Sequence, residues 1–191
     1  ITAENLVINN AGEATLTCVY GGNYTFTHCT FNNNWNSSNQ MAVTLSNFKL
    51  GSVPETNALS KATFNNCIIY GAYTNELELI KKTGAAFEYQ FNNCLIKFDS
   101  KSEAANPLYQ FTTDATHYNA IILNQDPKFQ SITKNKLNID GSSSAVAKGN
   151  ATQGNMVYYD VKYSTIQNDE IFISAKSDDY TATLQYEITP Q

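Results

Sequence analysis

The chain has 191 residues, and 42% of them are hydrophobic, which is enough for one folded domain with a core. Its net charge is −5, and all twelve basic residues are lysines. Nucleic acids and anionic membrane surfaces are disfavoured as partners, because both are bound through clustered positive charge. No apolar run reaches the roughly 18 residues of a membrane-spanning helix, so we expect no membrane insertion.

The chain opens at Ile1 without a recognisable secretion signal, and strand-forming residues follow at once. Short runs of Val, Ile, Thr, Tyr and Phe are separated by Asn, Gly and Ser, which predicts an all-β protein. The first run, residues 5–10, lacks an end cap, so we expect the chain to be the C-terminal part of a longer protein. Predicted strands in this half are 6–8, 14–20, 24–31, 42–48 and 76–80, with a loop over 49–59.

A Phe-x-x-Cys motif occurs three times, at Phe26/Cys29, Phe64/Cys67 and Phe91/Cys94. The copies are 38 and 27 residues apart (64 − 26 and 91 − 64), and one turn of a strand coil needs roughly two dozen residues. The shorter interval therefore corresponds to one coil, and the longer one to a coil plus an insertion within residues 32–58. Such a repeat predicts a solenoid whose successive coils pair in parallel.

Each Phe stands three positions before its Cys. Because side chains alternate between the two faces of a strand, Phe and Cys would lie on opposite faces if the strand were flat. We therefore predict bends at the Asn-Asn pairs 65–66 and 92–93, so that Phe and Cys both face the core. Equivalent residues would lie about 4.8 Å apart, with Cys above Cys and Asn above Asn or His28. Because Ile68 and Leu95 then point outward, a loop must cover them.

The four cysteines, at positions 18, 29, 67 and 94, contain no CxxC pair, and only two histidines are present, so a zinc site is disfavoured. An even count permits disulfides. Three of the four, however, hold the same buried repeat position, where a thiol acts as a small hydrophobic group. Parallel side chains are also poorly aimed at each other for a disulfide. We therefore favour free thiols, and we expect no metal and no cofactor.

The repeat breaks at residues 99–117, where we expect a helical turn near 104–109 that Pro107 begins or ends. A strand at 120–123 follows, and the last fifty residues keep strand composition without the repeat. We predict parallel β-helix coils over residues 1–160 and cap strands over 161–191 of the same domain. The strands expected near the C-terminus, where antiparallel pairing is possible, are 157–163, 171–175 and 181–188.

Several segments share features with one known family: residues 66–71, 75–79, the block 18–35, 126–129 and 144–150. Through them, most of residues 5–160 resembles the right-handed parallel β-helix proteins of Bacteroidetes, distant relatives of pectate lyases in fold. In 144–150 a Ser stands where the family often has Pro. The resemblance implies a single-stranded solenoid with a less regular C-terminal cap, in an extracellular or cell-surface protein that an upstream lipid anchor could hold. It implies no activity.

Catalytic chemistry finds little support in the sequence. A lyase resembling pectate lyase needs a base beside Ca²⁺-binding acids, yet there is no Arg and no Lys with three acids in one repeat. Glu76 and Glu78 lie about 7 Å apart by strand rise, within the range of glycosidase carboxyl pairs, although a solvated strand face explains them better. We expect His28 to be a bend or ladder residue and His117 an exposed loop residue. We identify no catalytic residue.

The polar loops rich in aromatic residues are the best binding candidates. Trp35 lies among Asn and Ser residues, and Tyr70 and Tyr73 flank a glycine. Aromatic faces beside amide groups suit a sugar ring, although Trp35 could instead fold back over Ile68. The predicted ligand-binding residues are Trp35, Tyr70, Tyr73, Glu76 and Glu78.

Three functions follow as hypotheses. The first is a monomeric, non-catalytic extracellular β-helix module that binds polysaccharide or cell-surface glycan or has a structural role. The second is the C-terminal fragment of a polysaccharide lyase or glycoside hydrolase whose active site lies upstream. The third is an adhesin-like surface element.

Overall fold

The computed structural model describes residues 1–35, 41–49, 55–99, 101, 105–152, 164–165, 171–176 and 181–185. The chain divides into two compact units, Ile1–Gly154 and Asn155–Gln191. Regular structure in the described residues is mostly β-strand, and it includes the short 3₁₀ helices η2 (Pro107–Tyr109) and η3 (Ile132–Lys134). The predicted all-β class is confirmed.

Most strands of the first unit form three parallel sheets. Sheet A contains β1 (Thr2–Glu4), β4 (Gly22–Thr27), β9 (Leu59–Asn65), β12 (Gln90–Asn92) and β14 (Tyr118–Asn119). Sheet B contains β2 (Val7–Asn9), β5 (Thr30–Asn33), β10 (Ile68–Gly71), β13 (Leu95–Ile96) and β15 (Ile122–Leu123). Sheet C contains β3 (Leu16–Cys18), β6 (Val43–Ser46) and β11 (Leu77–Ile80).

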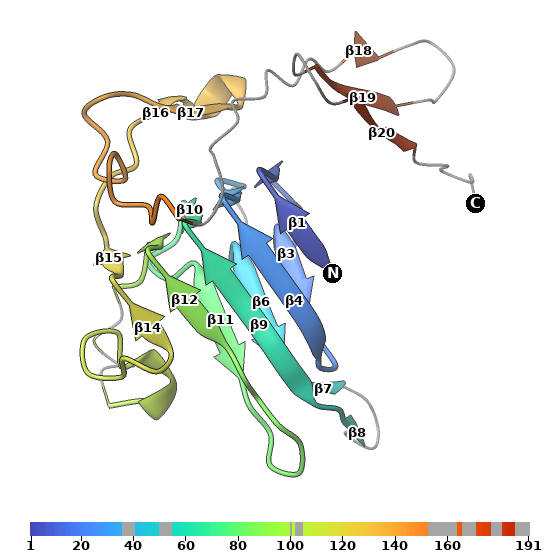
Figure 1. Cartoon of the computed structure of the whole chain (residues 1–191), viewed down its shortest axis with the longest axis vertical. Coiled ribbons are helices and arrows are strands. Elements are labelled where there is room, and N and C mark those ends of the chain that lie inside the picture. The colour runs from blue at the N-terminus through green and yellow to red at the C-terminus, as the bar shows by residue number, and fades with distance from the viewer. Residues whose placement is uncertain are drawn as a thin grey trace. The chain divides into compact units, whose positions relative to one another are not determined.

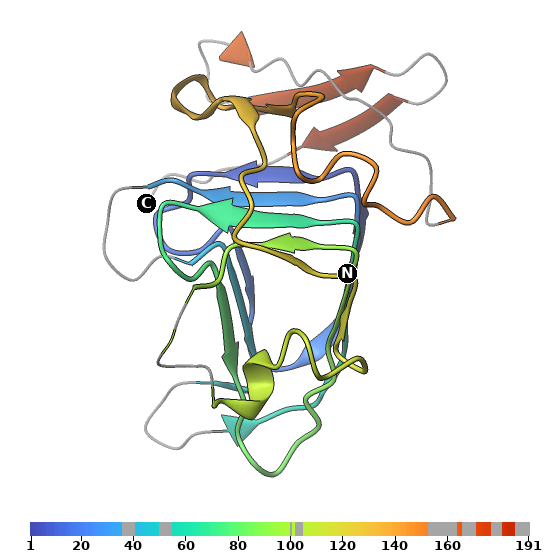
Figure 2. The ribbon, with the colours of Figure 1, turned by 90° about the vertical axis from the view of Figure 1, so that its left-hand side faces the viewer.

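In the first three circuits the chain runs through sheets A, B and C in turn and then returns to sheet A beside its previous strand; the circuit that begins at β12 returns to sheet A after sheet B. We call each such circuit a pass. Figure 1 shows the strands of sheet A side by side with those of sheet C behind them, and Figure 2 shows the same sheets from the side. The predicted parallel pairing of successive passes is confirmed. Pairing in sheet A aligns one core position in every pass: Ala3, Phe26, Phe64, Phe91 and Tyr118.

A residue with left-handed backbone separates sheet A from sheet B in each pass. The values of φ are 55° at Asn5, 55° at His28, 54° at Asn66, 53° at Asn93 and 52° at Ala120. The predicted bends, and the role of His28 as a bend residue, are confirmed. The predicted unbroken strands 24–31 and 120–123 are wrong, because a bend residue lies within each of them.

The three phenylalanines of the repeat stack through the core. Phe26, Phe64 and Phe91 are at most 1% exposed, and neighbouring ring centroids lie 5.1 and 4.8 Å apart. The side chains of all three sheets contribute to this one core.

The thiols form the single column that the repeat predicts. Each thiol lies within hydrogen-bond distance of two carbonyls. One belongs to the residue two positions earlier, at 3.2–3.3 Å. The other belongs to the core position one pass earlier: Ala3 for Cys29 (3.6 Å), Phe26 for Cys67 (3.6 Å) and Phe64 for Cys94 (3.4 Å). These three cysteines and Cys18 are buried and free, as predicted.

The longer second pass contains the expected insertion. An antiparallel hairpin of β7 (Phe48–Lys49) and β8 (Glu55–Thr56) follows sheet C in that pass. The predicted loop over 49–59 is therefore wrong in part, since β8 lies within it and β9 begins at Leu59.

A segment that we call the strap, residues 125–152, runs along the outer face of sheet B and contains the antiparallel strands β16 (Phe129–Ser131) and β17 (Lys136–Ile139). Figure 2 shows it in orange. The bend amides hold it: Asn66 forms two hydrogen bonds with Asn150, and Asn93 donates to the Lys148 carbonyl.

The strap is the covering segment that we expected over Ile68 and Leu95, the two residues that point out of the core. Leu95 is only 1% exposed, and Phe129 of the strap contacts the Tyr70 ring of the same sheet. The Asn66 and Asn93 amides thus bond to the strap, whereas the predicted stacking of Asn on Asn occurs one residue earlier, where Asn92 donates to Asn65 at 2.9 Å.

The second unit contains β18 (Ser164–Thr165), β19 (Ile171–Lys176) and β20 (Thr181–Gln185) in one antiparallel sheet. The two later strands confirm the prediction, whereas the strand expected at 157–163 lies outside the described residues. The division into coils and cap at residue 160 stays a prediction. In the part of the chain that the structure describes, no helix has the length and apolar character to cross a membrane.

Candidate functional site

The corner between sheets B and C gathers four of the five predicted binding residues. Tyr70 lies in β10, Tyr73 lies in the turn that follows, and Glu76 directly precedes β11. Trp35 follows β5 in the neighbouring pass, and the hydrogen bond from Ala72 N–H to the Asn33 carbonyl (2.9 Å) holds the two segments together. Trp35 is 51% exposed, so it does not fold back as a cover for Ile68.

A pocket of about 230 Å³ lies at this corner, lined by Tyr70, Ala72, Thr74, Lys97, Asp99 and Asn124. The Lys97 ammonium lies 5.1 Å from the centre of the Tyr70 ring and donates to the Gly71 carbonyl at 2.6 Å. The pocket therefore combines an aromatic ring with a cation, a carboxylate, an amide and a hydroxyl group.

Glu76 is fully buried behind the pocket, in contrast to the solvated position that the sequence favours. Its Oε1 accepts from the Tyr73 N–H at 2.7 Å, and its Oε2 accepts from the Ala42 N–H at 2.9 Å. Burial raises the pKa of this carboxyl to about 7, although the two N–H donors and Lys97 act in the opposite direction.

Glu78 lies on the outer face of β11 and accepts from the Thr44 hydroxyl at 3.3 Å. Its carboxyl and that of Glu76 thus bond to different partners, one on the strand face and one inside the corner. The shared solvated face that we predicted for them is wrong, because the chain turns at Glu76 before β11 begins. This is not the facing pair that glycoside hydrolysis requires.

Sequence reasoning missed Lys97, Asp99 and Asn124. The repeat contains a signal for two of them, because Lys97 and Asn124 stand 27 and 54 residues after Tyr70 (97 − 70 and 124 − 70). Both numbers are multiples of the interval between Phe64 and Phe91, so the three residues occupy equivalent positions in consecutive passes. The backbone bond from Asn124 N–H to the Ile96 carbonyl (3.0 Å) confirms that alignment.

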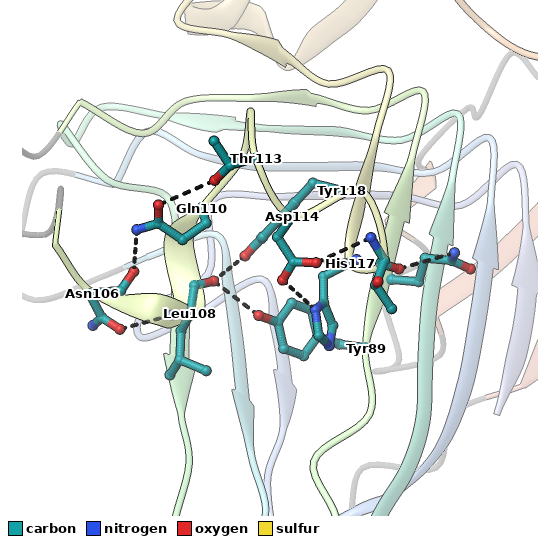
Figure 3. Close-up of polar contacts among 10 residues, drawn as sticks. Tyr89, Asn106, Leu108, Gln110, Thr113, Asp114, His117 and Tyr118 are labelled. Carbon is teal, nitrogen blue, oxygen red and sulfur yellow. Dashed lines mark hydrogen bonds and ion pairs between the residues drawn. The ribbon is translucent and has the colours of Figure 1, made fainter.

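A second polar cluster lies in residues 105–119, which close one end of the core (Figure 3). Pro107 begins η2 there, as one of the two predicted alternatives has it. His117 Nδ1 lies 2.6 Å from Asp114 Oδ2, and its ring stacks on Tyr89 with centroids 4.3 Å apart. The His117 side chain is only 27% exposed, so the predicted exposed loop histidine is wrong.

This cluster has a structural explanation. The hydroxyls of Tyr89 and Tyr118 both donate to the Leu108 carbonyl, and the Tyr109 hydroxyl accepts from the Leu79 N–H at the edge of sheet C (2.8 Å). These bonds close the sheet edge and cover the last aromatic residues of the core. Burial acts to raise the pKa of Asp114, but the bonds and charge of His117, together with the Thr116 N–H, outweigh it and lower that pKa below its ordinary value.

Among the residues that the structure describes, no three or more His, Cys, Asp or Glu side chains are grouped so that they could hold a metal ion. Comparisons with protein families, characterised proteins and solved structures give no match to this chain.

Proposed function

We propose that the first unit is a right-handed parallel β-helix of an extracellular or cell-surface protein, of the type that the sequence resembles, and that it binds carbohydrate without catalysis. The handedness follows from a general rule: connections between parallel strands of one sheet are right-handed in about 98% of cases. In this unit the pairs β1–β4, β4–β9 and β9–β12 of sheet A are each joined by a connection through sheets B and C, and β12–β14 by a connection through sheet B.

The observation that supports carbohydrate binding best is the composition of the corner pocket. Tyr70 offers an apolar ring face, while Thr74, Lys97, Asp99 and Asn124 offer donors and acceptors around it. A sugar ring has the complementary chemistry, with an apolar face and hydroxyl groups at its edge.

The size of the pocket limits the ligand. At about 230 Å³ it is smaller than the roughly 300–1,000 Å³ of sites for drug-sized molecules. We infer that it holds one ring or the end of a polysaccharide chain. Trp35 does not line the pocket but is half exposed in the adjacent pass, and we infer that it contacts a further ring of the same polysaccharide chain.

The test is a titration against cello-, xylo-, manno- and chito-oligosaccharides and oligogalacturonides. We expect one class to bind and Tyr70→Ala to weaken that binding at least tenfold, whereas Trp35→Ala weakens it less. Tyr20→Ala is the matched control, because Tyr20 is exposed and bonds to Glu55, outside the pocket. Absence of binding across the panel, or equal losses for Tyr70→Ala and Tyr20→Ala, would contradict the proposal. Product release from any of these sugars would favour an enzyme instead.

A further inference from the structure

One wall of the pocket is the turn from Gly71 to Glu76, which we call the wall turn. It contributes Ala72 and Thr74 to the pocket lining. The buried Glu76 carboxyl holds it from behind, with one oxygen on the Tyr73 N–H and the other on the Ala42 N–H. A single carboxyl group thus connects the pocket wall to the residue before β6.

The fit around this carboxyl is close. A Cβ atom at position 71 would lie 2.2 Å from Glu76 Oε1 and 2.3 Å from the Asn33 carbonyl oxygen. Only glycine leaves room for the carboxyl at that position, so the closed wall turn depends on close packing around Glu76.

We propose that the wall turn is a proton-dependent gate of the pocket, closed over Glu76 when its carboxyl is protonated and opened to water when it is ionised. This inference deepens the proposed function and rests on the role of the pocket given there.

The sign follows from linkage between protonation and closure. In an open, hydrated turn Glu76 would have its ordinary pKa of 4.5, whereas burial in the closed turn raises the pKa to about 7. The closed turn therefore binds the proton more tightly. The equilibrium between the two forms therefore favours the closed turn most strongly below pH 4.5, and this preference falls as the pH rises to about 7. The ratio of closed to open turn falls by at most about 300-fold, because the two pKa values differ by about 2.5.

The other charged groups nearby do not provide this response. Lys97 and Tyr70 face Glu76, and the Asp126–Lys128 ion pair (2.9 Å) lies beyond Tyr70. Burial and then the Asp126 charge raise the pKa of Tyr70 above 10, and bonds from Lys128 lower the pKa of Asp126 below 3.8. Tyr70 therefore stays neutral and Asp126 stays ionised between pH 4.5 and 7.

The test is amide hydrogen exchange of the ligand-free protein, followed by NMR at Tyr73 and Ala42 and corrected for the intrinsic pH dependence of exchange. We expect protection of both amides to fall between pH 4.5 and 8, by as much as about 300-fold, with most of the change complete near pH 7. Glu88→Gln, which removes an exposed carboxyl just before β12, should keep this dependence, and Glu76→Gln should abolish it.

Because Glu76→Gln could also disturb the turn, the ¹³C shift of the Glu76 carboxyl in the unmodified protein provides a second measurement. A midpoint near 7 supports the gate. A midpoint near 4.5, or protection that stays constant or rises with pH, overturns it. Neither measurement uses a sugar, so failure here leaves carbohydrate binding to its own test.

Discussion

The rings of Phe64 and Phe91 lie 4.8 Å apart, centroid to centroid, with only 16° between their planes. The two residues are 27 positions apart in sequence and directly paired in sheet A. Their contact shows how the core is built: each pass places an equivalent side chain on the one before it. Because the stack is continuous, a defect in one pass removes contacts to the passes on both sides.

Phe64→Ala should therefore be among the most damaging core substitutions. Phe64 is fully buried and contacts the rings of Phe26, Phe31 and Phe91. We expect a loss of about 3–5 kcal/mol in the free energy of unfolding, measured by chemical denaturation. Thr63→Ala, on the outer face of the same strand, should cost less than about 0.5 kcal/mol. Similar losses for the two variants would show that Phe64 is not a core residue.

The left-handed bend predicts opposite effects for two substitutions. Asn66→Ala should lower the free energy of unfolding by about 1–3 kcal/mol, because alanine disfavours φ of 54° and the two bonds to Asn150 are lost. Ala120→Gly should raise it by about 0.5–1 kcal/mol, because glycine relieves the strain at φ of 52°. A loss of stability in Ala120→Gly would contradict the assignment of this bend.

Gly71→Ala should disrupt the corner between sheets B and C. The added methyl group would overlap the Glu76 carboxyl and the Asn33 carbonyl, so the wall turn must move. We expect a loss of about 2 kcal/mol or more in unfolding experiments, together with shifted amide resonances at Tyr73 and Ala42. Gly141→Ala is the control, because a Cβ atom there meets nothing within 4 Å. Equal stability of the two variants would rule out the packed turn.

The cysteine column predicts slow thiol chemistry. All four thiols are buried, which keeps a reagent away from them. Burial also raises the pKa of Cys67 well above its ordinary value and that of Cys18 to about 12, whereas the hydrogen bond from Cys67 lowers the pKa of Cys29. Since the thiolate is the reactive form, we expect Ellman's reagent to react negligibly with the native protein and to titrate four thiols after denaturation. Rapid reaction of the native protein, or fewer than four thiols in the denatured protein under non-reducing conditions, would contradict the free, buried column.

Buried Glu76 gives the whole protein a pH dependence with a definite sign. Its pKa is raised from 4.5 to about 7, so the native state binds more protons than the unfolded state in that interval. Its contribution to stability is largest below pH 4.5 and falls, by at most about 3 kcal/mol, as the pH rises to 7. Urea denaturation from pH 4.5 to 8 measures this change, and Glu76→Gln should flatten it. A curve for the unmodified protein that rises over the interval would contradict the buried carboxyl.

The sequence predicted those parts of the fold that depend on repetition. The spacing of Phe64, Cys67, Phe91 and Cys94 indicated parallel passes, and the parity between Phe and Cys indicated the Asn bends. Ala3 and Tyr118 occupy the same column but lack the Phe-x-x-Cys pattern, so only their pairing identifies them.

The site was harder to predict, since it depends on contacts between passes. Alternation along residues 76–80 puts Glu76 on an outer face, but the amides of Tyr73 and Ala42 bring its carboxyl inward. Only the position of Ala42, directly before β6 in the preceding pass, makes that arrangement possible. His117 was misjudged for a similar reason, because its partner Tyr89 belongs to the preceding pass.

Carbohydrate binding at the corner pocket is tested most directly by chemical-shift mapping of the ¹⁵N-labelled protein with the oligosaccharide panel. We predict that one sugar class shifts the amides of Tyr70, Lys97 and Asn124, which three consecutive passes bring to one place, and leaves the 105–119 segment unchanged. Shifts centred on that segment or on the outer face of sheet A, or none with any sugar, would contradict the assignment of the pocket.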